Sequence, residues 1–171
     1  MSAVIPALVV MGVTACGKST IAQSIAERAG GKHIEGDLFH SPASIARMRA
    51  GIALNDEDRA AWLVQLGQLL AEAVAKGEKP VLSCSALKRA YRNQLRKAVP
   101  GLGFVFLDIS EAEVNRRVAR RKGHFMSREL VGSQFATLQS PVGEPGVLTV
   151  DATQSVDDIS RQAVTWWDAR R

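Results

Sequence analysis

Hydrophobic residues in this chain gather in short continuous runs, and longer amphipathic segments separate these runs. The first run covers residues 3–11, AVIPALVVM, where apolar side chains follow one another instead of alternating with polar ones. Continuous runs of this kind are typical of strands buried on both faces, as in a parallel sheet. Further runs predict strands over 32–37, 81–85, 103–109 and 146–151.

The segments between these runs carry the signals that begin and end helices. They predict helices over 18–31, 41–51, 55–77, 87–98, 110–121, 127–139 and from 155 towards the C-terminus. Polar capping residues stand at four of the expected starts: Ser41, Asn55 or Asp56, Ser110 and Ser155. Because helices alternate with five strands, we expect an α/β fold with three layers and a five-stranded parallel sheet whose crossovers are right-handed.

Length and composition limit the range of possible proteins. The chain has 171 residues, which fits one domain with a substantial core, so we expect a single domain over 1–171. No apolar run approaches the length of a membrane span, about 20 residues, and the first residues lack the basic region of a secretory signal. Two cysteines, Cys16 and Cys84, do not make a disulfide framework. We therefore expect a cytoplasmic protein with no membrane partner.

The formal net charge of +5 is compatible with a nucleic-acid partner or with a pocket for small polyanions. Basic residues concentrate in two groups, 87–97 and 115–125. The chain has only one Tyr, and aromatic side chains are too scarce around these groups to form a stacking platform for single strands. Each group alone is also compatible with a solvated helix face. We expect no nucleic-acid partner.

Residues 12–19, GVTACGKS, match the pattern Gly-x-x-x-x-Gly-Lys-Ser between a buried strand and a helix. In this context backbone N–H groups surround phosphate oxygens, and the helix start points its positive dipole end at them. Lys18 would neutralise the β- and γ-phosphates, and the Ser19 hydroxyl would ligate Mg²⁺. The pattern predicts an ATP–Mg²⁺ site formed by Gly12, Val13, Thr14, Ala15, Cys16, Gly17, Lys18, Ser19 and Thr20.

The remaining sequence favours a kinase over other triphosphate enzymes. The base-reading Asn-Lys-x-Asp of GTPases is absent, and the strand over 81–85 ends without the acid that motor ATPases use for metal. The free acid at the carboxyl end of a strand is Asp37. Asp37 would orient the acceptor hydroxyl, accept its proton and touch the metal's water shell. The alternative is a turn or capping role near Ser41.

With these motifs in place, the chain resembles the gluconate kinase family of P-loop small-molecule kinases. The resemblance rests on four ordered stretches: MGVTACGKST, GDLFHSPASIARMRAGIALNDEDRAAWL, VLSCSALKRAYRNQLR and RKGHFMSRELVGSQFATLQSP. It implies transfer of the ATP γ-phosphoryl group to the 6-hydroxyl of D-gluconate, a step of carbohydrate acid catabolism. It also implies a mobile lid over about 117–128 and pairing as a homodimer. Ala15 and Cys16 stand where relatives more often have Ser or Gly.

A gluconate site needs a cation for the carboxylate and several hydrogen-bonding groups for the hydroxyls. Lys88 and Arg92 lie four residues apart, directly after the strand over 81–85, and we expect both to contact substrate carboxylate or phosphate. A solvated helix face is the alternative for Lys88 and Arg92, and Arg49 is a weaker candidate for the same role. His40 would bind a hydroxyl of the sugar acid, unless it is only a loop histidine with its partners satisfied.

The resemblance also assigns residues around the lid. Arg117 and Arg121 match lid arginines, of which Arg121 would fold over the transferring phosphoryl group and Arg117 would contact the nucleotide. Gln154, after the last strand, stands where related kinases hold adenine. His124 and Gln134 follow the lid arginines, and the sequence assigns neither of them to nucleotide or sugar.

Two alternatives to gluconate phosphorylation stay open at this point. One is a kinase of another small acid such as shikimate, or of a nucleoside, and the other is a nucleic-acid-binding ATPase. The phosphate loop raises a separate question, because a cysteine near a helix N-terminus has a lowered pKa. Cys16 is therefore either a reactive thiol that nucleotide protects or an inert small residue of the loop.

Overall fold

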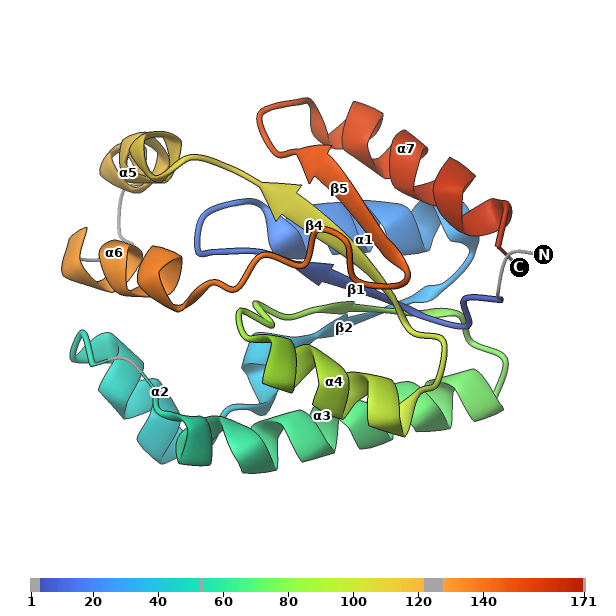
Figure 1. The fold of residues 1–171 in the computed structure, drawn as a ribbon, viewed down its shortest axis with the longest axis horizontal. Coiled ribbons are helices and arrows are strands. Elements are labelled where there is room, and N and C mark those ends of the chain that lie inside the picture. Colours follow the sequence, from blue (N-terminus) through green and yellow to red (C-terminus); the bar gives the residue numbers. More distant parts are fainter. Residues whose placement is uncertain (1–3, 53, 122–127, 171) are drawn as a thin grey trace.

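The computed structural model describes residues 4–52, 54–121 and 128–170. Its centre is a sheet of five parallel strands in the order β2-β3-β1-β4-β5 (Figure 1). The strands are β1 (Leu8–Met11), β2 (Lys32–Glu35), β3 (Pro80–Ser83), β4 (Gly103–Asp108) and β5 (Val147–Asp151). The predicted α/β fold with a five-stranded parallel sheet is confirmed.

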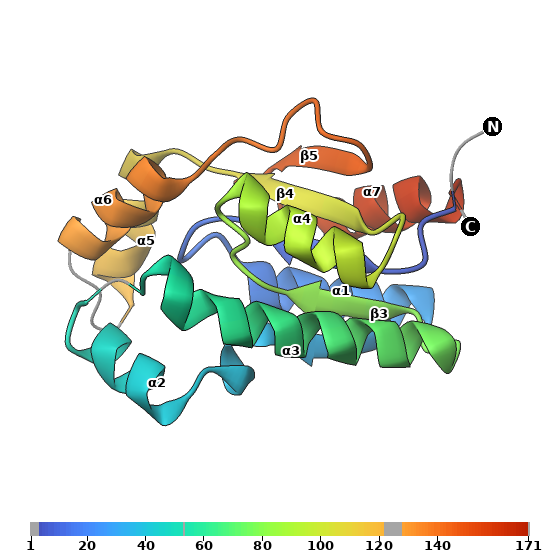
Figure 2. The same cartoon turned by 60° about the horizontal axis from the view of Figure 1, so that its bottom comes forward.

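Helices cover both faces of the sheet. They are α1 (Lys18–Ala29), α2 (Pro42–Arg49), α3 (Asp56–Ala75), α4 (Arg89–Ala98), α5 (Glu111–Arg120), α6 (Arg128–Thr137) and α7 (Val156–Asp168), with a 3₁₀ turn η1 (Gly36–Phe39) after β2. Figures 1 and 2 show α1 and α7 on one face and α3 and α4 on the other. Helices α2, α5 and α6 lie beyond the carboxyl ends of the strands, where the site is expected.

The alternation of side chains along the strands separates two cores. On β1, Leu8 and Val10 pack towards α1 and α7, whereas Val9 and Met11 pack towards α3 and α4. All four side chains are fully buried. The continuous apolar run that predicted this strand therefore reflects burial on both faces. Among the described residues, no helix is long and apolar enough to cross a membrane.

The predicted capping residues occupy their positions. Ser41, Asn55, Ser110 and Ser155 each accept a hydrogen bond from the backbone N–H three residues later. At Asn55 the cap is a reciprocal capping box, because the Asp58 side chain also accepts a hydrogen bond from the backbone N–H of Asn55. At Ser110 it is only half formed, since the Glu113 carboxylate pairs with Arg116 and Arg117 instead.

Several element boundaries differ from the sequence-based prediction by a few residues, and the structure explains two of these differences. The first strand starts at Leu8 and not at residue 3, because the chain before it is tied to α7: Ile5 N–H donates to the Arg170 carbonyl, and the Trp167 indole donates to the Ile5 carbonyl. Helix α4 starts at Arg89 and not at residue 87, because the backbone of Lys88 is still extended. Half of the predicted lid over 117–128, namely 122–127 with His124, lies outside the described residues.

Candidate active site

The loop between β1 and α1 has the geometry of an anion cradle. Gly12 has a φ of 150°, and a Cβ there would lie 2.9 Å from Cys16 Sγ and 3.1 Å from the Leu107 carbonyl oxygen, so only glycine fits. Gly17, in the left-handed region, is the N-cap of α1. Because it has no side chain, it does not cap the first N–H groups of the helix. Lys18, Ser19 and Thr20 form the first turn of α1. Free N–H donors at a helix start fit a phosphate group.

The lysine of this loop is already aimed over the cradle. Lys18 Nζ donates a 3.0 Å hydrogen bond to the Val13 carbonyl and lies 4.0 Å from Cys16 Sγ. The ammonium group is thus held where phosphate oxygens would enter. Cys16 itself is buried, with 1% of its surface exposed, so the structure favours the inert loop residue over the reactive thiol. Burial also raises the pKa of Cys84 to about 12.

Asp37 lies in η1, at the carboxyl end of β2, and contacts with Trp62 and His40 hold it in place. The Trp62 indole N–H donates a 2.8 Å hydrogen bond to the Gly36 carbonyl. The His40 ring stacks on Trp62 with a centroid separation of 4.0 Å, and its Nε2 lies 3.5 Å from Asp37 Oδ1. The Asp37 side chain is 73% exposed, so its carboxylate faces the open end of the crevice.

The surroundings of Asp37 favour its charged form. The hydrogen bond from His40 lowers the pKa of Asp37, partial burial opposes this effect, and the charges of Lys18 and Arg59 lower the pKa further. The group is therefore an ionised carboxylate at neutral pH, able to accept a hydrogen bond from a hydroxyl or from a metal-bound water. Within the described residues, no group of three His, Cys, Asp or Glu side chains is placed to hold a metal ion.

A cavity of about 280 Å³ opens beside the phosphate loop, and we call it the acceptor cavity. It is of the size that suits a small ligand. Four elements form its wall, namely the end of α2, the start of α3, the start of α4 and α6. The lining residues are Met48, Leu54, Asn55, Asp56, Arg59, Leu87, Lys88, Tyr91, Leu130, Ser133, Gln134 and Thr137.

Charged side chains in this wall are linked to one another. Lys88 Nζ donates a 2.8 Å hydrogen bond to Asp56 Oδ1, which also accepts the Tyr91 hydroxyl. Hydrogen bonds from Lys88 and Tyr91 lower the pKa of Asp56, and the bond to Asp56 raises the pKa of Lys88. The Arg59 guanidinium lies 5.6 Å from the Tyr91 ring centre, and its Nε is buried without a hydrogen-bond partner in the described part of the chain. The cavity wall thus carries two cations, Lys88 and Arg59, and one carboxylate, Asp56. Because the positive charge is in excess and hydrogen-bonding groups are present, the cavity can bind an anion that carries hydroxyl groups.

The structure corrects the expectation that Arg92 contacts substrate. Its side chain is completely buried and pairs with Glu144 through a 2.6 Å contact, and its remaining donors serve the carbonyls of Ala86, Leu87 and Gln139. Arg92 therefore ties the start of α4 to the loop between α6 and β5 and has no donor facing the acceptor cavity. Of the predicted pair, only Lys88 lines that cavity.

Three other predicted substrate residues, Asp37, Arg49 and His40, do not line the cavity wall. Arg49 is exposed at the end of α2 and does not line the acceptor cavity. His40 is also absent from its wall, since its side chain is 3% exposed and packs behind Asp37. The structure thus gives His40 the role of holding Asp37.

On the nucleotide side, Arg117 bridges two loops. Its guanidinium donates to the Ala15 carbonyl at 3.1 Å and to the Ala152 carbonyl at 2.9 Å, which joins the phosphate loop to the turn after β5. Gln154 lies in that turn, is exposed, and donates to the Asp151 carbonyl. Arg121 is exposed at the end of α5, and the next six residues are outside the described part of the chain.

Sequence reasoning left three residues of this region without an assigned role. Gln134 accepts a 2.6 Å hydrogen bond from the backbone N–H of Thr14, in the phosphate loop. Tyr91 and Arg59 line the acceptor cavity. Arg59 stands one turn beyond the capping Asn55, and Tyr91 one turn beyond Lys88, so helical spacing from residues already under consideration was the available signal.

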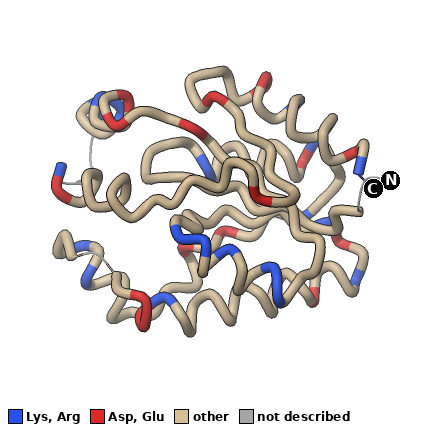
Figure 3. The backbone as a smooth tube through the Cα atoms, in the orientation of Figure 1, with Lys and Arg blue, Asp and Glu red and all other residues tan. Residues whose placement is uncertain are grey.

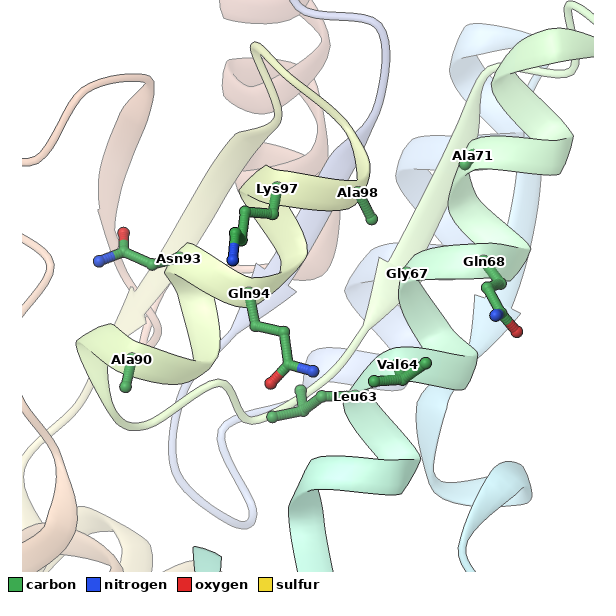
Figure 4. A pocket seen from close by; sticks show the side chains of 10 residues that line it. All are labelled: Leu63, Val64, Gly67, Gln68, Ala71, Ala90, Asn93, Gln94, Lys97 and Ala98. Carbon is green, nitrogen blue, oxygen red and sulfur yellow. The ribbon is translucent and has the colours of Figure 1, made fainter.

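A second cavity, of about 870 Å³, lies on the outer side of α3 and α4 (Figure 4). Its lining includes Gly67 and Ala71 from α3 and Ala90 and Ala98 from α4. The polar side chains around it are Gln68, Asn93, Gln94 and Lys97, and none of them is a carboxylate. This lining shares no residue with the acceptor cavity and includes none that contacts the phosphate loop, so we leave it out of the candidate active site.

Known proteins are similar to this chain in sequence and fold. A family model described as an AAA domain matches residues 8–145. The gluconokinase of Gluconobacter oxydans is 42% identical over 95% of this chain and 91% of its own length, and the thermoresistant gluconokinase of Escherichia coli is 36% identical over 88% and 87%. The crystal structure of a gluconokinase from Sinorhizobium meliloti superposes with a TM-score of 0.88, at 43% identity over 97% of this chain and 94% of that one.

Proposed function

This chain belongs to the gluconokinase family, and we propose that it transfers the γ-phosphoryl group of ATP to the 6-hydroxyl of D-gluconate, forming 6-phospho-D-gluconate. One observation carries the assignment to this site. The phosphate loop and a small cavity with two cations open side by side at the carboxyl edge of the sheet, and Gln134 touches both. That is the arrangement needed to bring a phosphoryl donor and a small anionic acceptor together.

For the nucleotide, we propose that the backbone N–H groups of residues 13–18 surround the β- and γ-phosphates. Lys18 neutralises their charge, and the Ser19 hydroxyl ligates the Mg²⁺ ion that accompanies ATP. Gly12 and Thr20 bound this cradle at its two ends. Arg117 and Gln154 contact the nucleotide beyond the phosphates, because Arg117 donates to the turn after β5 and Gln154 lies in that turn.

For the sugar acid, we propose that the carboxylate binds between Lys88 and Arg59 and that the hydroxyls bind Asp56 and Tyr91. Lys88 and Arg59 supply the positive charge, and Arg59 Nε is a buried donor that still needs an acceptor. Gluconate replaces the water that would otherwise solvate these groups. The same set suits nucleosides poorly, since they have no carboxylate.

The transfer itself then depends on two charged side chains. The ionised Asp37 orients the 6-hydroxyl and accepts its proton as the phosphoryl group arrives, and it contacts the water shell of Mg²⁺. We propose that Arg121 folds over the phosphoryl group as part of a lid over about 117–128 and neutralises its equatorial oxygens. Closure of the lid would exclude water from the reaction.

We also propose that the protein acts in the cytoplasm, where ATP is supplied, and that it has no nucleic-acid partner. Figure 3 supports the second point, because Lys and Arg are interspersed with Asp and Glu over several elements. The proposal of a homodimer rests on the family resemblance. Analytical ultracentrifugation of the purified chain tests it, and a single species at monomer mass would refute it.

A coupled assay of ADP release tests the proposed activity. The purified chain is given ATP–Mg²⁺ with D-gluconate, with other sugar acids, with shikimate, with nucleosides, or with single-stranded DNA. We expect turnover with gluconate, a product phosphorylated at its 6-position by ³¹P NMR, and no stimulation by DNA. Faster turnover with shikimate or a nucleoside, or turnover that requires DNA, would refute the proposal.

A further inference from the structure

Gln134 lies on α6 between the phosphate loop and the acceptor cavity. Its side-chain oxygen Oε1 accepts a hydrogen bond of 2.6 Å from the backbone N–H of Thr14. The same side chain belongs to the wall of the acceptor cavity, next to Ser133 and one turn before Thr137. The contact joins residues 120 positions apart in the sequence.

In the proposed nucleotide site, the Thr14 N–H is one of the backbone donors to phosphate. A backbone N–H has a single hydrogen, so Gln134 Oε1 and a phosphoryl oxygen compete for it. A hydrogen bond to a charged phosphate is about twice as strong as one between neutral groups. Entry of the triphosphate should therefore displace the amide of Gln134 from Thr14.

The displaced amide has a place to go. Gln134 already borders the acceptor cavity, and within the described residues its Nε2 has no hydrogen-bond partner. A half-buried amide that loses its acceptor role costs free energy until it finds another partner. The hydroxyl groups of a sugar acid both donate and accept hydrogen bonds, so they match both ends of the amide.

We propose that Gln134 couples the two substrate sites: its oxygen occupies the Thr14 N–H until nucleotide takes that donor, and the released amide then binds a hydroxyl of the acceptor. This inference rests on the proposed function for the identity of the acceptor. It makes Gln134 a substrate-positioning residue, and it predicts that nucleotide binding strengthens gluconate binding and the reverse by the same factor.

Gln134→Met tests the first half, because methionine has a similar length and no hydrogen-bonding amide. With a non-hydrolysable ATP analogue and Mg²⁺, and without gluconate, isothermal titration calorimetry should show the variant binding nucleotide several-fold more tightly than the wild type. The physical reason is that the phosphate no longer has to break the bond between Gln134 and Thr14. Equal or weaker nucleotide binding by the variant would overturn the inference.

The second half is tested by the affinity for gluconate with and without the analogue. In the wild type we expect nucleotide to tighten gluconate binding by about tenfold, within the usual range of coupling between sites. In Gln134→Met the ratio of the two affinities should fall to near one. A ratio that is the same in both proteins, or a wild type without coupling, contradicts the inference.

Gln139→Met is the matched control. Gln139 also uses its side-chain oxygen to accept a backbone N–H, that of Arg89 at 2.8 Å, but it does not line the acceptor cavity. This variant should keep the wild-type coupling ratio. If Gln139→Met also loses the coupling, the effect of Gln134→Met reflects a general loss of stability, and the inference is overturned. If the wild type fails to phosphorylate gluconate, the proposed function fails, and the nucleotide-only titration still decides whether Gln134 competes for Thr14.

Discussion

Replacing Arg92 by Met separates a structural role from a substrate-binding one. The side chain is completely buried, it shares Glu144 with Arg96, and it donates to three backbone carbonyls. Methionine fills much of the same volume but leaves these carbonyls and part of the Glu144 charge without donors. Breaking a buried pair from one side costs about 3–5 kcal/mol, and we expect the lower end because Arg96 still holds Glu144.

The expected loss of about 3 kcal/mol corresponds to a Tm lower by roughly 6–12 °C for a chain of this length. Thermal melting by circular dichroism and urea titration measure it. At a temperature where both proteins are folded, the KM for gluconate should change by less than about threefold, because Arg92 has no donor in the acceptor cavity. Lys88→Met is the comparison: it should leave Tm nearly unchanged and raise KM.

Acidification gives a further check on the same pair. Burial raises the pKa of Glu144, but the hydrogen bonds and charges of Arg92 and Arg96 outweigh it, so the pKa lies below its ordinary value of 4.5. Such a group stabilises the fold above the unfolded-state pKa, and this stabilisation is lost as the pH falls through the folded-state pKa. The unfolding free energy should therefore drop less on acidification in Arg92→Met than in the wild type. The structural assignment of Arg92 would be refuted by an unchanged Tm together with a tenfold higher KM.

Four other substitutions test the site. Lys18→Ala should abolish turnover, since its charge acts mainly in the transition state, and more than about a tenth of wild-type activity would contradict that role. Asp37→Asn should lower kcat by about 100-fold or more with nucleotide affinity nearly intact; a folded variant with an unchanged rate would make Asp37 a turn residue. Arg121→Ala should lower kcat more than it raises KM for gluconate, and the opposite pattern would place Arg121 in the substrate site. Tyr91→Phe should raise KM for gluconate several-fold through loss of its hydroxyl at Asp56, and an unaltered KM would exclude that contact.

Much of the fold could be predicted because the signals were local. A continuous apolar run such as the one ending at Met11 reports burial on both faces, and capping residues such as Asn55 act on N–H groups three positions away. The phosphate loop was found for the same reason, since its glycines, Lys18 and Ser19 are consecutive. The resemblance to gluconate kinases added the substrate, which no local pattern specifies, and the comparisons confirmed the family.

The errors arose where a contact depended on distant parts of the chain. Lys88 and Arg92 are four residues apart and would share a face if both were helical, but Lys88 has φ −101° and ψ 145° and precedes the helix. Arg92 then meets Glu144, which lies 52 positions later. The contact of Gln134 with Thr14 spans 120 positions, so no spacing rule could have found it. The predicted roles of Arg117, Arg121 and Gln154 stay predictions.

The stacking of His40 on Trp62 has a practical consequence for observing the enzyme. The chain has three tryptophans, and the other two, Trp166 and Trp167, lie on α7, on the opposite face of the sheet. Indole emission is sensitive to an adjacent imidazole ring, and this ring touches Asp37 on its other side. Any event that moves Asp37 should therefore alter the fluorescence of Trp62, which gives the protein an intrinsic optical reporter of this carboxylate.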